Sequence, residues 1–143
     1  MSLHGPYDDT NVFARILRGE LPAARVHEDA RALTIMDAFP QARGHCLVIP
    51  KAPARTLMDL APELVGPLFA RVQRVAGAVI AALEPDGVVV TQFNGTPAGQ
   101  TVFHLHVHII PRYAGTELKG HGAAGAGDMQ ELQALAAHIS ARL

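Results

Sequence analysis

The chain of 143 residues contains no tryptophan, one cysteine and only 5 % aromatic residues. A single cysteine, Cys46, excludes an internal disulfide bond and favours a reducing compartment, so we expect a cytoplasmic protein. An excess of charge of one sign is also lacking, because 12 Lys and Arg residues nearly balance 13 Asp and Glu residues. Without a basic excess, we do not expect stable binding to nucleic acid through its phosphates.

Long hydrophobic runs are absent as well. No uninterrupted apolar stretch reaches the ~18–20 residues that cross a membrane, and the first residues are polar and acidic rather than a hydrophobic signal core. We therefore expect no association with a membrane. The length suits one domain, which would bury roughly two thirds of its unfolded surface.

The periodicity of the apolar residues predicts alternating strands and helices. The predicted strands cover 25–28, 32–37, 45–49, 88–93 and 102–110, and the predicted helices cover 9–18, 61–83 and 128–142. Five strands with a long helix across one face define an α+β fold built on a five-stranded antiparallel sheet.

We expect a single domain with a core at about 12–113, a flexible Gly-rich segment at 114–127 and a C-terminal helix at 128–142. Asp128 and Glu131 have the spacing of a capping box at the start of that last helix.

Three histidines alternate with apolar residues in the segment Phe103–Ile110. Alternation with a period of two predicts a strand on which His104, His106 and His108 share one face, with successive rings about 6.5–7 Å apart. The apolar residues between them then face a core. An ordinary strand does not need three titratable rings in a row on one face, so the pattern indicates that these histidines have a chemical function.

A single histidine on a strand would be structural, and His-x-His on a strand can also place two imidazole nitrogens on one zinc ion. A zinc site needs a further ligand, and none lies nearby in the sequence. The preceding segment Asn94–Thr101 favours a third interpretation, because its two glycines and one proline predict a tight loop that can present backbone N–H groups to an anion. Asn94, Gln100 and Thr101 add neutral donors, which beside imidazoles suit a phosphate better than zinc.

The segment Gly99–Arg112 resembles the signature of the histidine triad (HIT) superfamily, in which three histidines alternate with apolar residues. The segment 13–23 resembles the opening of the branch that contains the purine nucleoside phosphoramidases, and 35–41 and 44–51 resemble its central strands. The similarity covers about residues 12–113. It implies the HIT-like fold and a homodimer, in which the main helices pair and the sheets join into a continuous ten-stranded sheet.

The resemblance also assigns catalytic roles. It implies that His106 is the nucleophile and forms a nucleotidyl-histidine intermediate that water hydrolyses. His108 is then expected to donate to the phosphoryl oxygens or to protonate the leaving group. His104 supports this ring network, and His45 joins it from the neighbouring strand.

Four further positions match family residues that contact the phosphate or the leaving group. They are Asn94, Gly99, Gln100 and Thr101.

At the nucleoside end, Asp37 matches the carboxylate that accepts hydrogen bonds from the ribose hydroxyls. Phe13, Ile16 and Ile35 match the apolar slot around the purine, although their pattern alone would make them core residues. No residue provides an evident base-specific donor, so the sequence does not choose between adenine and guanine.

The chain also departs from the family. Ala52 and Pro53 stand where many relatives have another histidine, and the first helix lacks the Cys-x-x-Cys that helps to bind structural zinc in some bacterial relatives. We therefore expect no metal and no cofactor. His121, in the Gly-rich segment, is a candidate to close over the site.

These features predict a hydrolase of nucleoside 5′-phosphoramidates or related nucleoside monophosphate derivatives, with a purine nucleotide or nucleotide conjugate as its ligand. One alternative is a diadenosine polyphosphate hydrolase, because Gln100–Val102 is also compatible with that branch. The other is a nucleotide-binding scaffold module with little turnover. A nucleotidyltransferase of the galactose-1-phosphate class is disfavoured, since that group has glutamine at the position of His108.

Overall fold

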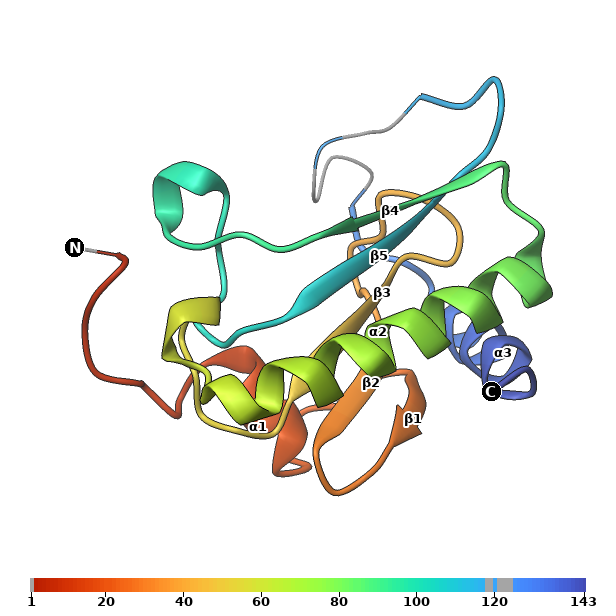
Figure 1. The fold of residues 1–143 in the computed structure, drawn as a ribbon. Helices are drawn as coiled ribbons and strands as arrows, with labels where there is room; N and C mark the ends of the chain where they lie inside the picture. Colours follow the sequence, from red (N-terminus) through yellow and green to blue (C-terminus); the bar gives the residue numbers. More distant parts are fainter. Residues whose placement is uncertain (1, 118–119, 121–124) are drawn as a thin grey trace.

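The computed structural model describes residues 2–117, 120 and 125–143. Five strands form one antiparallel sheet in the order β1-β2-β3-β5-β4 (Figure 1), as the sequence predicts. The strands are β1 (Arg25–Glu28), β2 (Ala32–Met36), β3 (Cys46–Pro50), β4 (Gly87–Thr91) and β5 (Val107–Arg112). The helices are α1 (Val12–Leu17), α2 (Pro62–Leu83) and α3 (Met129–Ser140), with 3-10 turns η1 (Leu57–Asp59) and η2 (Thr96–Ala98).

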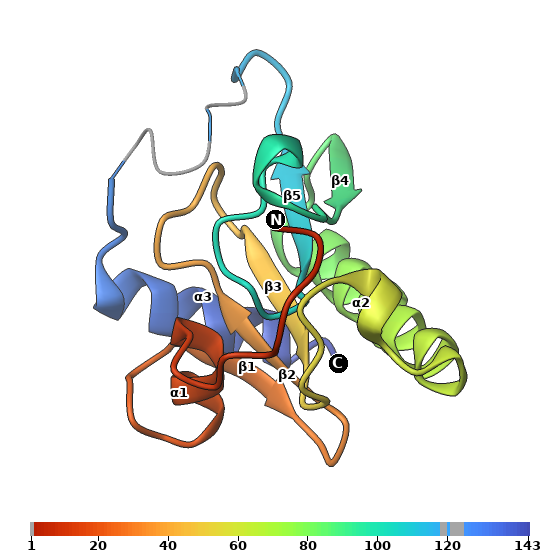
Figure 2. The same ribbon diagram turned by 90° about the vertical axis from the view of Figure 1, so that its left-hand side faces the viewer.

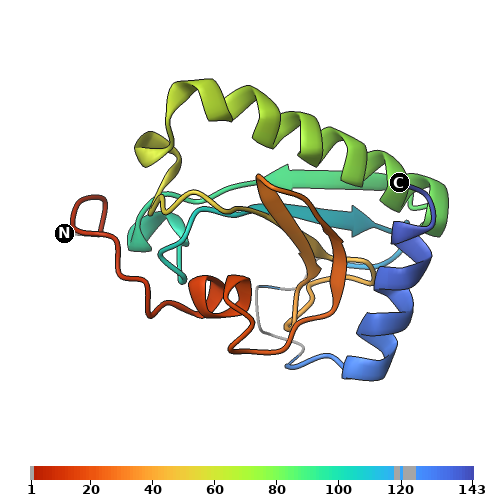
Figure 3. The same cartoon turned by 90° about the horizontal axis from the view of Figure 1, so that it is seen from below.

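The helices cover both faces of the sheet, whereas the sequence predicts one long helix on one face. Figure 3 shows α2 along one face, α1 on the other and α3 at the end of the sheet. In Figure 2, α3 lies beside β1 and β2, which it contacts. The expected α+β class is therefore confirmed, with a second layer that the sequence analysis does not predict.

Two apolar clusters separate along the strands because alternate side chains point to opposite faces. The side of the sheet that faces α2 and α3 carries a large cluster that includes Val26, Met36, Val48, Val75, Ile109 and Ile139. The side that faces α1 carries a smaller one, made of Phe13, Ile16, Leu33, Ile35, Leu47 and Ile49. Every residue of β2 and β3 is buried, as expected for central strands covered on both sides.

Helix α2 begins at Pro62, whose ring is compatible with the first helical position, and ends before Glu84, which adopts a left-handed conformation. Among the described residues it is the one helix long and apolar enough to cross a membrane, with a mean hydropathy of 1.3 over 18 residues. A core helix passes the same test, and α2 packs Leu68, Val72 and Val75 against the sheet.

The prediction that the three histidines share one face of a strand over 102–110 is wrong, because β5 begins only at Val107. Before it, the backbone N–H of Leu105 donates to the carbonyl of Ala54 (2.8 Å), outside the sheet. The pairing of β3 with β5 covers only three residue pairs, from Val48 opposite Val107 to Cys46 opposite Ile109. The chain therefore turns away from the sheet where His104 and His106 lie.

The C-terminal helix begins one residue later than predicted. The carboxylate of Asp128 caps it by accepting a hydrogen bond from the backbone N–H of Glu131 (3.2 Å). The backbone N–H of Gly127 donates to the carbonyl of Ala38 (2.8 Å), which fixes the start of α3 beside the loop after β2. Residues 118–119 and 121–124 of the predicted flexible segment, His121 among them, lie outside the described residues.

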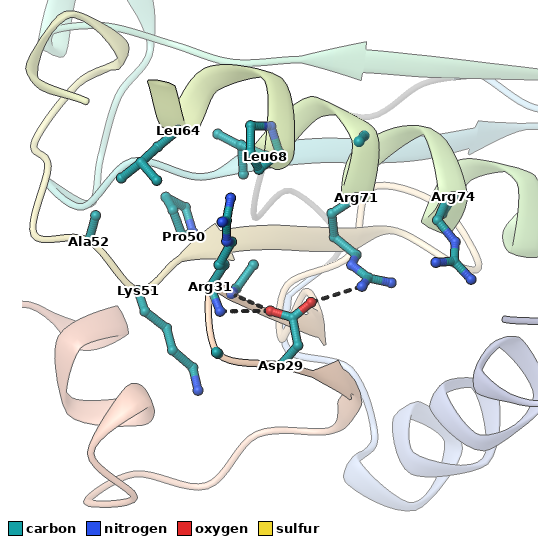
Figure 4. Close-up of a pocket in the computed structure, with 13 residues that line it drawn as sticks. Asp29, Arg31, Pro50, Lys51, Ala52, Leu64, Leu68, Arg71 and Arg74 are labelled. Atoms are coloured by element: carbon teal, nitrogen blue, oxygen red, sulfur yellow. Dashed lines mark hydrogen bonds and ion pairs between the residues drawn. The ribbon is translucent and has the colours of Figure 1, made fainter. Parts of the chain in front are cut away.

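Asp29 joins the β1–β2 turn to α2 (Figure 4). Its carboxylate accepts hydrogen bonds from the backbone N–H groups of Arg31 (2.8 Å) and Ala32 (2.9 Å) and from the guanidinium of Arg71 (2.8 Å). The two backbone donors, and then Arg71, lower the pKa of Asp29 to about 2. A carboxyl group with a pKa below its unfolded value stabilises the folded state above pH ~4, and the contribution disappears as the pH falls towards 2.

Asp29→Ala is therefore expected to lower the free energy of unfolding by about 1–2 kcal/mol at pH 7, because three donors lose their acceptor. The difference from wild type should shrink at pH 2.5. Urea denaturation at both pH values measures it, with the exposed Asp9→Ala as a matched control. Equal destabilisation by the two substitutions at pH 7 would contradict the prediction.

Candidate active site

A cavity of about 320 Å³ lies on the α1 side of the sheet. Seven of the residues predicted to form the site line it: Phe13, Ile16, Ile35, Asp37, Thr101, His106 and His108. Segments that are distant in the sequence therefore converge on one cavity.

A second cavity, of about 420 Å³, lies between α2 and the β1–β2 turn (Figure 4). Its walls carry Arg31, Arg71, Arg74 and Lys51 with one carboxylate, Asp29, and no imidazole, thiol or hydroxyl side chain. It therefore lacks the histidines that line the first cavity. The imidazole-lined cavity is therefore the candidate active site.

His106 is held in a tautomer that suits nucleophilic attack. Its Nδ1 lies 2.6 Å from the carbonyl oxygen of His104, and a carbonyl can only accept, so Nδ1 carries the proton. The lone pair of the neutral ring is consequently on Nε2. The ring packs edge-on against Phe13 (4.7 Å between ring centroids) and against His108 (5.0 Å).

His108 belongs to a second, buried set of hydrogen bonds. The backbone N–H of Gln41 donates to Nδ1 of His45 (3.0 Å), which leaves the proton of a neutral His45 on Nε2. That Nε2 lies 2.9 Å from Nδ1 of His108. With Nδ1 accepting, a neutral His108 carries its own proton on Nε2 and acts there as a donor. The backbone N–H of Gln41 thus determines which nitrogen carries the proton in both His45 and His108.

Asp37 follows β2 directly and is only 4 % exposed. One carboxylate oxygen accepts from the backbone N–H of Phe39 (2.8 Å), and the other lies 3.3 Å from Nε2 of His45. The carboxylate therefore borders the cavity and contacts the His45–His108 pair at the same time.

His104 does not line the cavity. Its Nε2 donates to the carbonyl of Pro50 (2.7 Å), and its Nδ1 accepts from the hydroxyl of Tyr7 (2.5 Å). Burial lowers the pKa of His104, while the bond to Pro50 opposes that shift. Both ring nitrogens of His104 are engaged in hydrogen bonds outside the cavity, so this histidine contributes to the site through its backbone carbonyl, which is bonded to His106.

The loop before the histidines holds its own shape with its polar side chains. The side-chain oxygen of Gln100 accepts from the backbone N–H of Gly95 (2.8 Å), and its amide donates to the carbonyls of Arg55 (2.7 Å) and Val102 (3.1 Å). Gln100 is 2 % exposed and does not line the cavity.

Asn94 and Gly99 also lie outside the cavity walls. The side-chain oxygen of Asn94 accepts from the backbone N–H of Leu57 (2.9 Å), and Gly99 has a φ of +110° that favours glycine. Thr101 is the residue of this loop that reaches the cavity. Direct phosphate contacts by the other predicted loop residues stay predictions.

Phe13, Ile16 and Ile35 serve two purposes. They belong to the smaller apolar cluster and they form a wall of the cavity.

Two residues of the cavity wall are not among those predicted from the sequence: Phe39, which is 47 % exposed, and Met129 of α3. Phe39 follows the predicted β2 strand and could have been found there, but no local signal connects α3 with a site some 20 residues or more away in the chain.

Among the described residues, the side chains of Asp37, His45 and His108 are close enough to bind one metal ion. Their candidate ligand atoms lie within 4.8 Å of one another. Two nitrogen ligands of a tetrahedral zinc ion are about 3.3 Å apart. The 2.9 Å between the two rings is instead a hydrogen bond, and Gln41 occupies the other nitrogen of His45. This set fits a proton network better than zinc.

The fold and the cavity define an α+β protein whose active-site candidate is a network of buried histidines. The family model of the HIT domain matches residues 18–115. The chain belongs to the HIT family.

Named relatives and solved structures agree with this membership. The chain is 40 % identical over 101 residues to Adenylylsulfatase HINT3 of Arabidopsis thaliana, covering 71 % of this chain and 51 % of that protein. It is 36 % identical over 101 residues to Adenosine 5′-monophosphoramidase hnt1 of Schizosaccharomyces pombe, covering 71 % and 73 %. The crystal structure of a HIT-like protein from Bartonella henselae is 43 % identical, with a TM-score of 0.92 and coverage of 97 % and 100 %.

The lowered pKa of His104 predicts a pH dependence of stability. The unfolded chain takes up a proton near pH 6.5, before the buried ring does, so the free energy of unfolding falls as the pH drops below about 6.5. His104→Gln removes this proton uptake and should flatten the curve by up to about 1.4 kcal/mol per pH unit. Urea denaturation of both proteins between pH 7.5 and 4.5 measures the slopes, and parallel curves would contradict the assignment.

Proposed function

We propose that the protein hydrolyses nucleoside 5′-phosphoramidates, or related nucleoside monophosphate derivatives, through a nucleotidyl intermediate on His106. The observation that carries this proposal is the bond from Nδ1 of His106 to the carbonyl of His104, because it leaves the lone pair on Nε2. The names of two relatives, an adenylylsulfatase and an adenosine 5′-monophosphoramidase, support an adenylyl substrate.

In the first step, Nε2 of His106 attacks the phosphorus, and the P–N bond breaks with its electron pair on the leaving nitrogen. The amine nitrogen takes a proton from the solvent as the P–N bond breaks and leaves as the neutral amine, while the Nε2–H of His108 donates a hydrogen bond to a phosphoryl oxygen. The proton on Nδ1 of His106 stays bonded to the carbonyl of His104, and this bond stabilises the positive charge of the phosphorylated ring.

In the second step, a water molecule attacks the phosphorus and the bond to His106 breaks. The proton lost by the water is released to the solvent, which balances the proton that the amine took up in the first step. The products are the amine, the nucleoside monophosphate and the original protonation state of both rings. His45 keeps His108 in this donor state, because its Nε2 donates to Nδ1 of His108 and also contacts the Asp37 carboxylate.

The nucleoside is proposed to lie across the apolar end of the same cavity. Phe13, Ile16 and Ile35 form a wall that suits a purine ring, and Asp37 is the carboxylate at the border that can accept from ribose hydroxyls. Phosphate would then rest against Thr101 and the two imidazoles.

His106→Ala is expected to abolish hydrolysis of adenosine 5′-phosphoramidate, with a fall in kcat/KM of about 10⁴-fold or more for removal of a nucleophile. Release of AMP measures the reaction. The matched control is His138→Ala, an exposed histidine of α3 that bonds the carbonyl of Ala82 away from this cavity. Diadenosine triphosphate serves as the competing substrate.

Preference of the wild type for the dinucleotide would support the polyphosphate hydrolase instead. Slow turnover of both compounds by folded protein would support a nucleotide-binding module. Activity of His106→Ala close to that of the control would overturn the nucleophile assignment.

A homodimer is the second part of the proposal. Phe69 and Ile80 are exposed on α2, eleven residues and therefore close to three turns apart, so they lie on one stripe. Gly66 and Gly77 beside this stripe have open space above them, which allows another helix to approach closely. Val90 of the edge strand β4 is exposed as well. Pairing of α2 and β4 with a second copy would produce the expected ten-stranded sheet.

Ile80→Glu should shift this protein from dimer to monomer, because it would bury a charge in an apolar interface. Size-exclusion chromatography with light scattering measures the mass across a dilution series. Gln133→Glu, which adds the same charge to an exposed position of α3, should leave the mass unchanged. A wild-type monomer at all concentrations would refute the dimer.

A further inference from the structure

The hydroxyl of Tyr7 contacts His104, the histidine of the triad that does not line the cavity. It lies 2.5 Å from Nδ1 of His104, and the two rings meet edge-on with their centroids 5.6 Å apart. Neither ring lines the nucleotide cavity, and His104 is 1 % exposed. The hydrogen bond between Tyr7 and His104 can therefore hold the site in shape, but it does not contact the substrate.

The direction of this hydrogen bond follows from the partners of the two groups. The carbonyl of Pro50 can only accept, so Nε2 of His104 carries the proton and Nδ1 of the neutral ring is an acceptor. Tyr7 must then donate to His104. Its oxygen accepts in turn from the side-chain amide of Asn11 (3.1 Å), which completes a chain from Asn11 through Tyr7 and His104 to Pro50.

His104, a member of this chain of hydrogen bonds, also carries the backbone carbonyl to which the nucleophile His106 is bonded. Both nitrogens of the His104 ring are bonded, to Tyr7 and to the carbonyl that ends β3, so the ring cannot rotate without breaking a buried hydrogen bond. The carbonyl of the same residue accepts the Nδ1 proton of His106. Fixing the His104 ring thus fixes the acceptor that selects the His106 tautomer.

Tyr7 itself is anchored by the segment around it. The guanidinium of Arg55 donates to the carbonyls of Ser2 (2.9 Å) and Pro6 (3.3 Å), and it lies over the ring of Phe103 (4.7 Å to the centroid). The hydroxyl of Ser2 accepts from the backbone N–H of Thr96 (2.9 Å). The segment 2–7 is therefore attached to Thr96 of the loop that precedes the histidines and to Arg55.

We propose that Tyr7 is a positioning residue, which donates to Nδ1 of His104 and thereby holds the His104 carbonyl where it orients His106. The effect on turnover rests on the proposed hydrolase function. The effect on the rings does not.

The first test is Tyr7→Phe, which keeps the aromatic ring and removes only the donor. We expect kcat for adenosine 5′-phosphoramidate to fall about 5- to 30-fold, the order of magnitude for one lost buried hydrogen bond, with KM within twofold of wild type. The matched control is the second tyrosine of the chain. Tyr113→Phe removes a hydroxyl that donates to the carbonyl of Arg43 (2.9 Å) and should keep kcat within twofold.

The second test uses ¹⁵N NMR of histidine-labelled protein to measure which nitrogen of each histidine ring carries the proton. In the wild type, His104 should be a single Nε2–H tautomer and His106 a single Nδ1–H tautomer. In Tyr7→Phe, His104 should lose the hydrogen-bonded shift of Nδ1 and His106 should become a mixture of tautomers. Both tautomers should stay unchanged in Tyr113→Phe.

The outcomes separate the two claims. A Tyr7→Phe protein with wild-type kcat and wild-type ring signals overturns the positioning role, and so does a rise in KM with kcat unchanged. If the wild type hydrolyses no phosphoramidate, the proposed function fails, and the NMR comparison alone decides whether Tyr7 orders the rings.

Discussion

The hydrogen bond between Nδ1 of His106 and the carbonyl of His104 is the constraint on which the site depends. It assigns a proton to one nitrogen and therefore a lone pair to the other, before any substrate arrives. An orientation set by a backbone group costs no reorganisation during the reaction, which is the basis of electrostatic preorganisation. The hydrogen bonds of the His104 ring hold the residue that carries this carbonyl, and those of His45 determine which nitrogen of the neighbouring His108 ring carries the proton.

Pairing of the strands in the sheet brings Asp37, His45 and His108 together. Asp37 follows the last residue of β2 and His45 precedes the first residue of β3, and the backbone N–H of Asp37 donates to the carbonyl of His45 (2.9 Å). The pairing of β3 with β5 then sets Leu47 opposite His108. The Asp37 carboxylate after β2, the His45 ring before β3 and the His108 ring of β5 consequently meet, and Asp37 and His108 both line the cavity.

Much of this arrangement can be predicted from the sequence. The five strands, the long helix and the cap of α3 follow from local periodicity and capping residues, which act over a few positions. The departure of His104 and His106 from the strand could not be predicted, because it depends on the bonds of Leu105 to Ala54 and of the His104 ring to Pro50, both about 50 residues away in the chain. The supporting roles of Gln100 and Tyr7 could not be predicted for the same reason, because Gln100 bonds to Arg55 and Tyr7 to His104, which are distant in the chain.

The cavity wall and the histidine network come from different parts of the chain. Helix α3 contributes Met129 and Leu132 to the wall, and neither residue is bonded to the rings. Substitutions on that helix can therefore reshape the space around a ligand while the protons on His106 and His108 stay where they are. In such a scaffold, the shape of the ligand space and the protonation of the rings can be changed independently of each other.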